Sequence, residues 1–188
     1  YLIMNFGKID KFVLIGGGAL INHFAEQVKK KGLECISIVS SRHVNEKIEK
    51  NTDLQTLLKK NSSFNKLDNL NSKNIQKIIG SNKNTIFISF GSPWIFSNDL
   101  IKNVFKKRII NSHNTRLPYD RGGGGFSWRI LNQDKFGICL LHLINDKKID
   151  NGEILMCEEF LFPYHLKKPI EFHNYQIEKE KTFLNNFL

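Results

Sequence analysis

The sequence lacks long hydrophobic runs, and this absence bounds the class of protein. Of its 188 residues 40% are hydrophobic, but no run approaches the roughly 18 residues that a membrane-spanning helix needs. The apolar run at residues 12–15 ends in glycines, and no cationic leader with a small-residue cleavage site precedes it. We therefore expect a soluble cytoplasmic protein with one globular core and no membrane partner. Residues 1–3 read as an added segment before Met4, the expected natural start.

Paired cysteines are also missing. Cys35, Cys139 and Cys157 show no Cys-x-x-Cys spacing and leave an odd number, which indicates neither a disulfide framework nor a zinc site. Cys35 and Cys139 lie in apolar runs, so we expect buried, inert thiols. No metal is expected.

Acidic residues are scarce beside basic ones, and the formal net charge is +10. Clustered Lys and Arg neutralise phosphates, so the charge alone is compatible with nucleic-acid binding. However, the lysines are spread widely, and no stretch interleaves basic and aromatic residues as a base-stacking platform would. A solvated lysine-rich surface is therefore favoured over nucleic acid, and an anionic small substrate fits the charge equally well.

The hydrophobic pattern predicts an α/β fold. Residues 11–15 predict a buried strand, 16–18 a tight turn, 19–31 an amphipathic helix and 33–39 a second strand. This βαβ unit implies a parallel sheet with a right-handed crossover. The polar stretch 40–84 predicts surface elements rather than a domain boundary. The other expected elements are strands at 85–90, 108–111, 137–144 and 153–160, and helices at 53–60, 72–79, 98–105 and 126–132.

The first turn, Gly16-Gly17-Gly18, lies between a strand and a helix N-terminus, where backbone N–H groups and the helix dipole favour phosphate. A dinucleotide fingerprint would need glycine at position 21, which is Ile21, and an acidic residue after the second strand. Neither is present, so an NAD-dependent oxidoreductase is disfavoured. A plain tight turn and an anion-binding, substrate-facing loop both remain open.

The polar groups with the strongest chemical pattern are Asn111, His113 and Asp150. Asn111 and His113 project from the same face of a strand, near its carboxyl end, where open α/β sheets place their ligands. Asp150 follows in a turn between two strands, with Asp146 as a rival carboxylate, and Gly152 indicates a backbone that needs conformational freedom. An amide, an imidazole and a carboxylate can polarise a carbonyl and move a proton without a metal or a covalent nucleophile.

The sequence around this trio resembles the folate-dependent formyltransferases, a family that includes methionyl-tRNA, glycinamide ribonucleotide and amino-sugar N-formyltransferases. The family pattern reads N-x-H-x-S-x-L-P-x-x-R-G and, further on, D-x-G-x-I. The matching residues here are Asn111, His113, Thr115, Leu117, Pro118, Arg121 and Gly122, then Asp150, Gly152 and Ile154. The resemblance covers residues 11–160. Thr115 replaces the usual Ser, residues 122–125 form a richer glycine run, and the first turn lacks the Gly-x-Gly-Ser-Asn of the glycinamide enzymes.

The resemblance implies a Rossmann-like formyltransferase fold, a mostly parallel sheet flanked by helices, and transfer of a formyl group from N10-formyltetrahydrofolate to a primary amine. It assigns the catalytic roles to Asn111, His113 and Asp150. Asn111 and a protonated His113 would stabilise the developing oxyanion, while Asp150 would keep His113 protonated and help remove the amine proton. The implied folate walls are Phe90, Gly91, Ser92, Pro93, Asn145, Asp146 and Ile149, and the implied acceptor side is Gly16, Gly17, Gly18, Arg121 and Gly122.

The amine acceptor is less constrained than the reaction. The motif residues most resemble those of the sugar N-formyltransferases, and this favours a nucleotide-linked amino sugar as the acceptor. The missing phosphate turn disfavours glycinamide ribonucleotide. The short chain after residue 160 disfavours tRNA, although a natural chain that continues past Leu188 would reopen that acceptor. Residues 1–165 are expected to form the catalytic domain and 166–188 a helical extension, and a homodimer is left open.

Two non-enzymatic alternatives remain. A folate- or nucleotide-binding module with a degenerate site would bind folate without turnover. A basic RNA-binding domain would show an affinity that falls steeply with salt and would not involve His113.

Overall fold

The computed structural model describes residues 6–49, 52–122 and 125–188, so the expected start at Met4 lies outside the described residues. One seven-stranded sheet forms its centre. Its strands are β1 (Lys11–Gly16), β2 (Glu34–Val39), β5 (Ser63–Lys66), β6 (Thr85–Phe90), β7 (Ile109–His113), β8 (Phe136–Leu143) and β9 (Ile154–Leu161). The helices are α1 (Gly18–Lys30), α2 (Leu54–Asn61), α3 (Ser72–Ile79), the π-helix η1 (Leu100–Val104), α4 (Gly125–Leu131) and α5 (Pro169–Phe187). A small separate sheet pairs β3 (Lys47–Glu49) with β4 (Thr52–Asp53).

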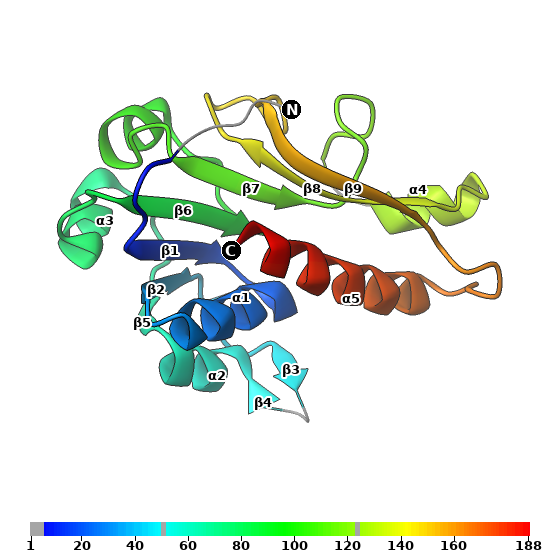
Figure 1. The fold of residues 1–188 in the computed structure, drawn as a ribbon, viewed down its shortest axis with the longest axis horizontal. Helices are drawn as coiled ribbons and strands as arrows, with labels where there is room; N and C mark the ends of the chain where they lie inside the picture. The colour runs from blue at the N-terminus through cyan, green and yellow to red at the C-terminus, as the bar shows by residue number, and fades with distance from the viewer. Residues whose placement is uncertain (1–5, 50–51, 123–124) are drawn as a thin grey trace.

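The strand order is β5-β2-β1-β6-β7-β8-β9. The first five strands in this order are parallel, and β8 and β9 run antiparallel to their neighbours. This confirms the predicted α/β class with a mostly parallel sheet (Figure 1). The chain leaves β1 toward β2 and β5 and then returns to the other side for β6 and β7. Open sheets bind ligands at the carboxyl edge beside such a change of direction.

Both faces of the sheet are covered because the central strands carry apolar side chains in both directions. In β1, Phe12 and Leu14 pack with α1, α2 and α5 on one face. Val13 and Ile15 pack with α3 and η1 on the other. Side chains alternate between faces along a strand, so an uninterrupted apolar strand requires a helical layer on each side.

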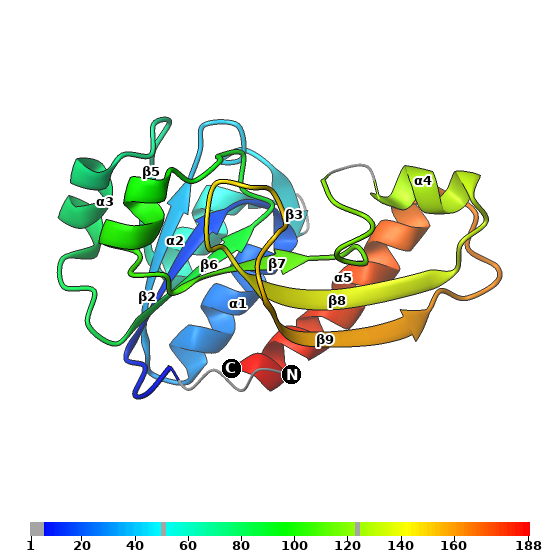
Figure 2. The same ribbon diagram turned by 90° about the horizontal axis from the view of Figure 1, so that it is seen from above.

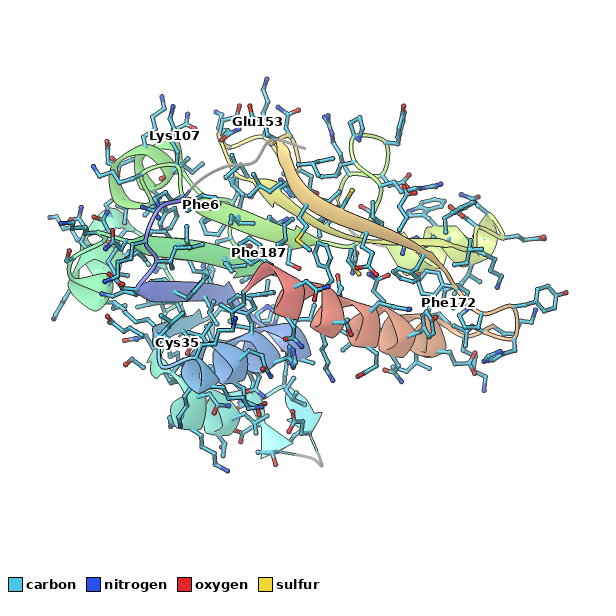
Figure 3. The ribbon with its side chains drawn as sticks, in the orientation of Figure 1. Phe6, Cys35, Lys107, Glu153, Phe172 and Phe187 are labelled. Carbon is cyan, nitrogen blue, oxygen red and sulfur yellow. The ribbon has the colours of Figure 1, made fainter. Side chains whose placement is uncertain are left out.

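The β8–β9 hairpin extends beyond the parallel strands and carries α4 near its far end (Figure 2). Helix α5 runs back along this hairpin, from Phe172 beside the far end to Phe187 near the middle of the sheet (Figure 3). Phe183 and Leu184 join the main core, and Gln176 Nε2 donates to the Ile138 carbonyl at 2.8 Å. The predicted division between residues 165 and 166 therefore falls just before a helix that packs on the same sheet.

Most predicted elements are confirmed within two residues, and three features differ. The short strands β3 and β4 were not predicted. Strand β5 (Ser63–Lys66) was not predicted, because it has only one apolar residue and joins the sheet edge through its backbone pairing with β2. The helix predicted at 98–105 is largely π-helical, since the Phe105 N–H donates to the Leu100 carbonyl five residues earlier.

The predicted burial of the two apolar-run cysteines is confirmed. Cys35 and Cys139 are buried, and burial raises the pKa of the Cys35 thiol to about 12, so this thiol stays protonated. Over the described ranges, none of the helices has the length and apolar character needed to cross a membrane.

Candidate active site

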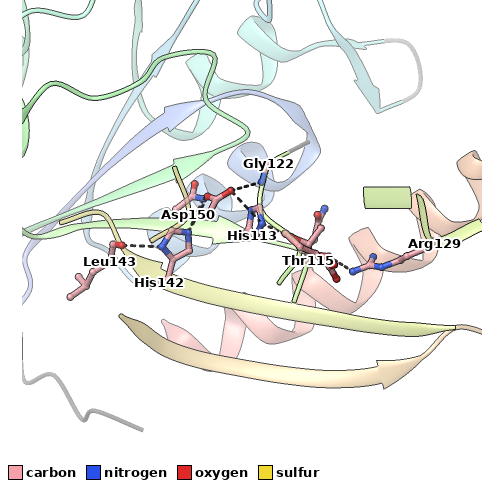
Figure 4. A network of polar contacts seen from close by, with 10 residues as sticks. His113, Thr115, Gly122, Arg129, His142, Leu143 and Asp150 are labelled. Carbon is pink, nitrogen blue, oxygen red and sulfur yellow. Dashed lines mark hydrogen bonds and ion pairs between the residues drawn. The ribbon is translucent and has the colours of Figure 1, made fainter. Parts of the chain in front are cut away.

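Strand β7 brings two of the three predicted catalytic residues to the carboxyl edge of the sheet. Asn111 and His113 are two residues apart and share a face of the strand. The antiparallel pairing of β7 with β8 sets Asn111 opposite His142. An amide and two imidazoles therefore gather where β7 ends (Figure 4).

The loop after β8 supplies Asp150, whose backbone has a left-handed φ of 50°. Gly152 lets this loop lie close to β8, since a Cβ at that position would be 1.5 Å from the Leu143 carbonyl oxygen. The Leu143 N–H donates to Glu153 O at 2.9 Å. The expectation that Gly152 supplies conformational freedom is thus wrong: Gly152 provides space, and the unusual φ belongs to Asp150.

The structure brings Asn111, His113 and Asp150 together. Asn111 Nδ2 donates to Asp150 Oδ1 at 3.3 Å, and His113 Nε2 lies 3.6 Å from Asp150 Oδ2. The Gly122 backbone N–H also donates to Asp150 Oδ2, at 3.0 Å. The rival Asp146 accepts from the Lys148 N–H at 2.7 Å instead. The geometry associates Asp150 with His113, and the catalytic roles stay predictions.

His142 is a residue of the site that the sequence analysis missed. It is 1% exposed, and its Nδ1 lies 2.9 Å from the Leu143 carbonyl oxygen. A carbonyl only accepts, so Nδ1 carries the proton and Nε2 is left to accept from Asn111 Nδ2 at 3.1 Å. His142 therefore orients the Asn111 amide. The sequence did carry one signal for this residue, a single histidine within an otherwise apolar strand.

Thr115 fixes the proton position on His113. Its hydroxyl donates to the Asp120 carbonyl, so it accepts from His113 Nε2 at 2.5 Å. Burial lowers the pKa of His113 below its ordinary value, although the Asp150 charge opposes this effect. The neutral imidazole therefore predominates at pH 7, and the expectation that Asp150 keeps His113 protonated is wrong for the free protein.

Asp150 itself is ionised at neutral pH. Burial acts to raise its pKa, but contacts with His142 and the Gly122 amide, together with the two nearby imidazoles, outweigh burial and lower the pKa below its ordinary value. The site thus pairs a carboxylate acceptor with the neutral imidazole of His113.

A cavity of about 430 Å³ adjoins the trio. Five of the predicted folate-wall residues line it, namely Gly91, Ser92, Pro93, Asp146 and Ile149. Phe90 does not, because its side chain is 2% exposed and packs in the core with its ring centroid 5.8 Å from that of Phe24. Asn145 also lies outside the residues that line the cavity. Trp94 and Ile95 add apolar surface that the sequence analysis did not assign.

The first glycine turn is occupied by groups of the chain itself. The Gly17 N–H donates to the Phe90 carbonyl at 2.9 Å, and the Gly18 N–H donates to Glu46 Oε2 at 2.9 Å. Glu46 Oε1 lies 2.6 Å from His43 Nδ1. None of the three glycines lines the cavity beside the trio. A carboxylate thus sits where the sequence allowed a phosphate, and the substrate role of this turn stays a prediction.

A second pocket has a volume of about 270 Å³. Gly122 lines both cavities, and Arg121 lines the second. The remaining lining residues of this pocket are Thr115, Arg116, Asp120, Trp128, Arg129, Asn132 and Asp134. Residues 123 and 124 of the glycine run lie outside the described residues. In the part of the chain that the structure describes, no three His, Cys, Asp or Glu side chains are grouped to hold a metal ion.

Solved structures share this fold over nearly the whole chain. Phosphoribosylglycinamide formyltransferase from Bacillus halodurans has a TM-score of 0.72 and 16% identity, with 95% of each chain covered. The enzyme of the same description from Streptococcus pneumoniae has a TM-score of 0.73 and 14% identity, with 95% of this chain and 96% of that chain covered. A formyltetrahydrofolate deformylase from Pseudomonas syringae has a TM-score of 0.71 and 14% identity, with 96% of this chain and 60% of that chain covered.

Curated relatives match a shorter part of the sequence, and no family model matches. Methionyl-tRNA formyltransferase from Ureaplasma urealyticum is 44% identical over 61 residues, which is 32% of this chain and 19% of the relative. The protein of the same description from Mycoplasma genitalium is 35% identical over 77 residues, 40% of this chain and 23% of the relative. The matched segment thus spans less than a quarter of either relative. The chain has the fold of the solved phosphoribosylglycinamide formyltransferases and local sequence similarity to methionyl-tRNA formyltransferases.

Proposed function

We propose that this protein is a cytoplasmic N-formyltransferase that moves a formyl group from N10-formyltetrahydrofolate to a primary amine. The observation that carries the proposal is the convergence of Asn111, His113 and Asp150 at the end of β7, beside a cavity. The shared fold and the local similarity to formyltransferases support it.

In this reaction the amine nitrogen bonds to the formyl carbon and the bond from that carbon to N10 breaks. One proton leaves the amine and one is gained by N10, so no net acid or base is consumed. Asp150 is ionised and can accept the amine proton. The formyl oxygen gains negative charge during attack, and donors aimed at it are worth a few kcal/mol each.

Asn111 is the first donor for that oxygen. Both hydrogens of its amide are engaged in the free protein, one by His142 Nε2 at 3.1 Å and one by Asp150 Oδ1 at 3.3 Å. The longer bond, to Asp150, is the one that a substrate oxygen would replace. His113 Nε2–H is the second donor, and it would have to turn from Thr115.

The cavity of about 430 Å³ suits the folate's flat ring system. Trp94, Ile95 and Ile149 offer apolar surface to such a ring, and Asp146 and Ser92 offer polar groups at its edge. These residues would hold the folate while Asn111 and His113 face its formyl group.

For the acceptor we propose a nucleotide-linked amino sugar. Glu46 holds the Gly18 N–H, which argues against an acceptor whose phosphate binds at the start of α1, as a helix N-terminus would otherwise favour. Methionyl-tRNA is the second candidate, favoured by the local identity of 44% over 61 residues and by the formal net charge of +10.

The test is formyl transfer from N10-formyltetrahydrofolate to a panel of three acceptor classes, with the product detected by mass spectrometry. The panel contains nucleotide-linked amino sugars, methionyl-tRNA and glycinamide ribonucleotide. Transfer to an amino sugar supports the proposal as stated, and transfer to methionyl-tRNA alone replaces the acceptor. Folate binding without transfer to any acceptor would make the protein a binding module.

A further inference from the structure

We propose that the pocket between Gly122 and α4 binds the non-reacting, anionic part of the amine acceptor, with Arg121 holding the anion and Trp128 stacking on a flat ring. This inference rests on the proposed function for its choice of substrate. The occupant assigned is a small ligand that combines a phosphate-type anion with a ring, such as a nucleoside diphosphate group.

The position of the pocket suits an acceptor. Gly122 lines both this pocket and the cavity beside the trio, so the two spaces meet at the amide that holds Asp150. Thr115 lines the pocket and contacts His113 Nε2 (Figure 4). A ligand here would extend past Gly122 to place its amine at His113 and Asp150, which line the cavity assigned to the folate.

The charges in the pocket favour one anion. Three arginines and two aspartates line it, which leaves one positive charge in excess. Arg116 is paired with both aspartates, since its Nε donates to Asp120 at 3.1 Å and its Nη2 to Asp134 at 2.7 Å. These ion pairs fix one wall of the pocket and leave neither aspartate free to repel an anionic ligand.

Arg129 is buried and its Nη2 donates to the Asn114 carbonyl at 2.6 Å, so Arg121 is the exposed cation that remains for a ligand. It is exposed and forms no ion pair with any residue in the described ranges. A guanidinium can hold phosphate or carboxylate oxygens through two parallel N–H groups. The excess charge of the pocket is therefore located on a side chain that can reach an incoming anion.

Trp128 supplies the second element of recognition. It lies on α4, lines the pocket and is 64% exposed, which is unusual for so large an apolar side chain. An exposed indole gains free energy when a flat ring or a sugar face covers it. Asn132 adds a hydrogen-bonding group to this pocket.

The experiment measures binding without turnover, by isothermal titration calorimetry at low salt. The probes are UDP, dTDP, inorganic pyrophosphate and glucosamine 6-phosphate, and 5-formyltetrahydrofolate reports the other cavity. At least one nucleoside diphosphate should bind the wild type. Arg121→Ala should weaken that binding by about tenfold or more, because the charge-assisted bonds are lost.

Trp128→Ala separates ring recognition from anion recognition. It should weaken the nucleoside diphosphate about fivefold but leave pyrophosphate unchanged, because pyrophosphate has no ring to stack. Leu131→Ala is the matched control, since Leu131 is an equally exposed apolar residue of α4 (72%) that does not line the pocket. Lys77→Ala on α3 controls for the loss of one surface charge. Binding of 5-formyltetrahydrofolate should be the same in all four variants.

Three outcomes would overturn the assignment. They are no binding of any probe at millimolar concentration, probe binding that is unchanged in both Arg121→Ala and Trp128→Ala, and binding of methionyl-tRNA with no diphosphate probe bound. If a probe binds through Arg121 and Trp128 but no acceptor is formylated, the pocket stands and the proposed function fails. If an acceptor is formylated with a KM unaffected by both variants, the function stands and the pocket assignment fails.

Discussion

Two places in this fold combine the same three groups, a backbone amide of a glycine, a carboxylate and an imidazole. At the start of α1, Glu46 accepts from the Gly18 N–H at 2.9 Å and contacts His43 at 2.6 Å. At the end of β7, Asp150 from the β8–β9 loop accepts from the Gly122 N–H at 3.0 Å and lies 3.6 Å from His113. By distance alone the first cluster is the tighter one.

The surroundings separate the two clusters. The Glu46 side chain is 36% exposed and holds the β3 end of the chain to the glycine turn. The Asp150 side chain is 9% exposed, is also contacted by Asn111 and His142, and borders a cavity. A carboxylate–imidazole pair therefore becomes a candidate site only where further donors and space for a substrate are present. The first cluster holds two segments of the chain together, and the second is the candidate active site.

The largest difference is expected between the two imidazoles. His113→Ala should lower kcat/KM for formyl transfer about 1,000-fold, because it removes a donor to the reacting carbonyl. His43→Ala should change it by less than about threefold once folding is verified by circular dichroism. Steady-state kinetics with the identified acceptor measures both. A similar loss in the two variants would show that the glycine turn takes part in the reaction.

The next largest effect is expected for the two carboxylates of the loop between β8 and β9. Asp150→Asn should lower kcat about 100-fold, because the proton acceptor is lost while the shape is kept. Asp146→Asn should mainly raise the KM for folate, since Asp146 lines that cavity and does not contact His113. Equal and mild effects on kcat would remove Asp150 from its assigned role.

A smaller effect is expected in the pH profile. Burial lowers the pKa of His113 below 6.5, so its neutral form predominates above that pH. If the neutral imidazole is the active form, kcat/KM falls as the pH decreases below 6.5. Asp150 raises the pKa of His113, so Asp150→Asn should move this acid limb to still lower pH. A rate that increases as the pH falls would assign the reaction to the protonated imidazole instead.

The smallest effect is expected for the Glu46 cluster at the start of α1. Glu46→Ala removes the acceptor of the first N–H of α1 and should lower the free energy of unfolding by about 1 kcal/mol, with kcat unchanged. Urea denaturation measures this loss, and Glu49→Ala, a nearby exposed glutamate, is the control. A large drop in kcat with unchanged stability would contradict the structural role.

The fold was predictable where hydrophobic periodicity determines the structure. The strand that became β6 was predicted at 85–90 and is found as Thr85–Phe90. Prediction failed at the sheet edge. There β5 (Ser63–Lys66) is held by backbone pairing, which requires no particular pattern of side chains. Similarly, nothing in residues 98–105 distinguishes a π-helix from an α-helix.

The site was predictable as far as residue type and strand position indicate it. Asn111 and His113 were found because they follow an apolar strand and share one face. His142 was missed because its role depends on the pairing of β7 with β8, which places it opposite Asn111. The protonation of His113 was predicted wrongly because its burial can only be seen in three dimensions.

The left-handed backbone of Asp150 has a consequence for evolution of this loop. A non-glycine residue at a φ of 50° carries a conformational cost. Asparagine tolerates this φ as well as aspartate does and is neutral. Asp150→Asn should therefore keep the loop backbone but be less stable than the wild type, because an amide has one acceptor oxygen where the carboxylate accepts from both Asn111 Nδ2 and the Gly122 N–H. Backbone conformation alone would favour glycine at this position, so the presence of aspartate represents a conformational cost accepted for its carboxylate.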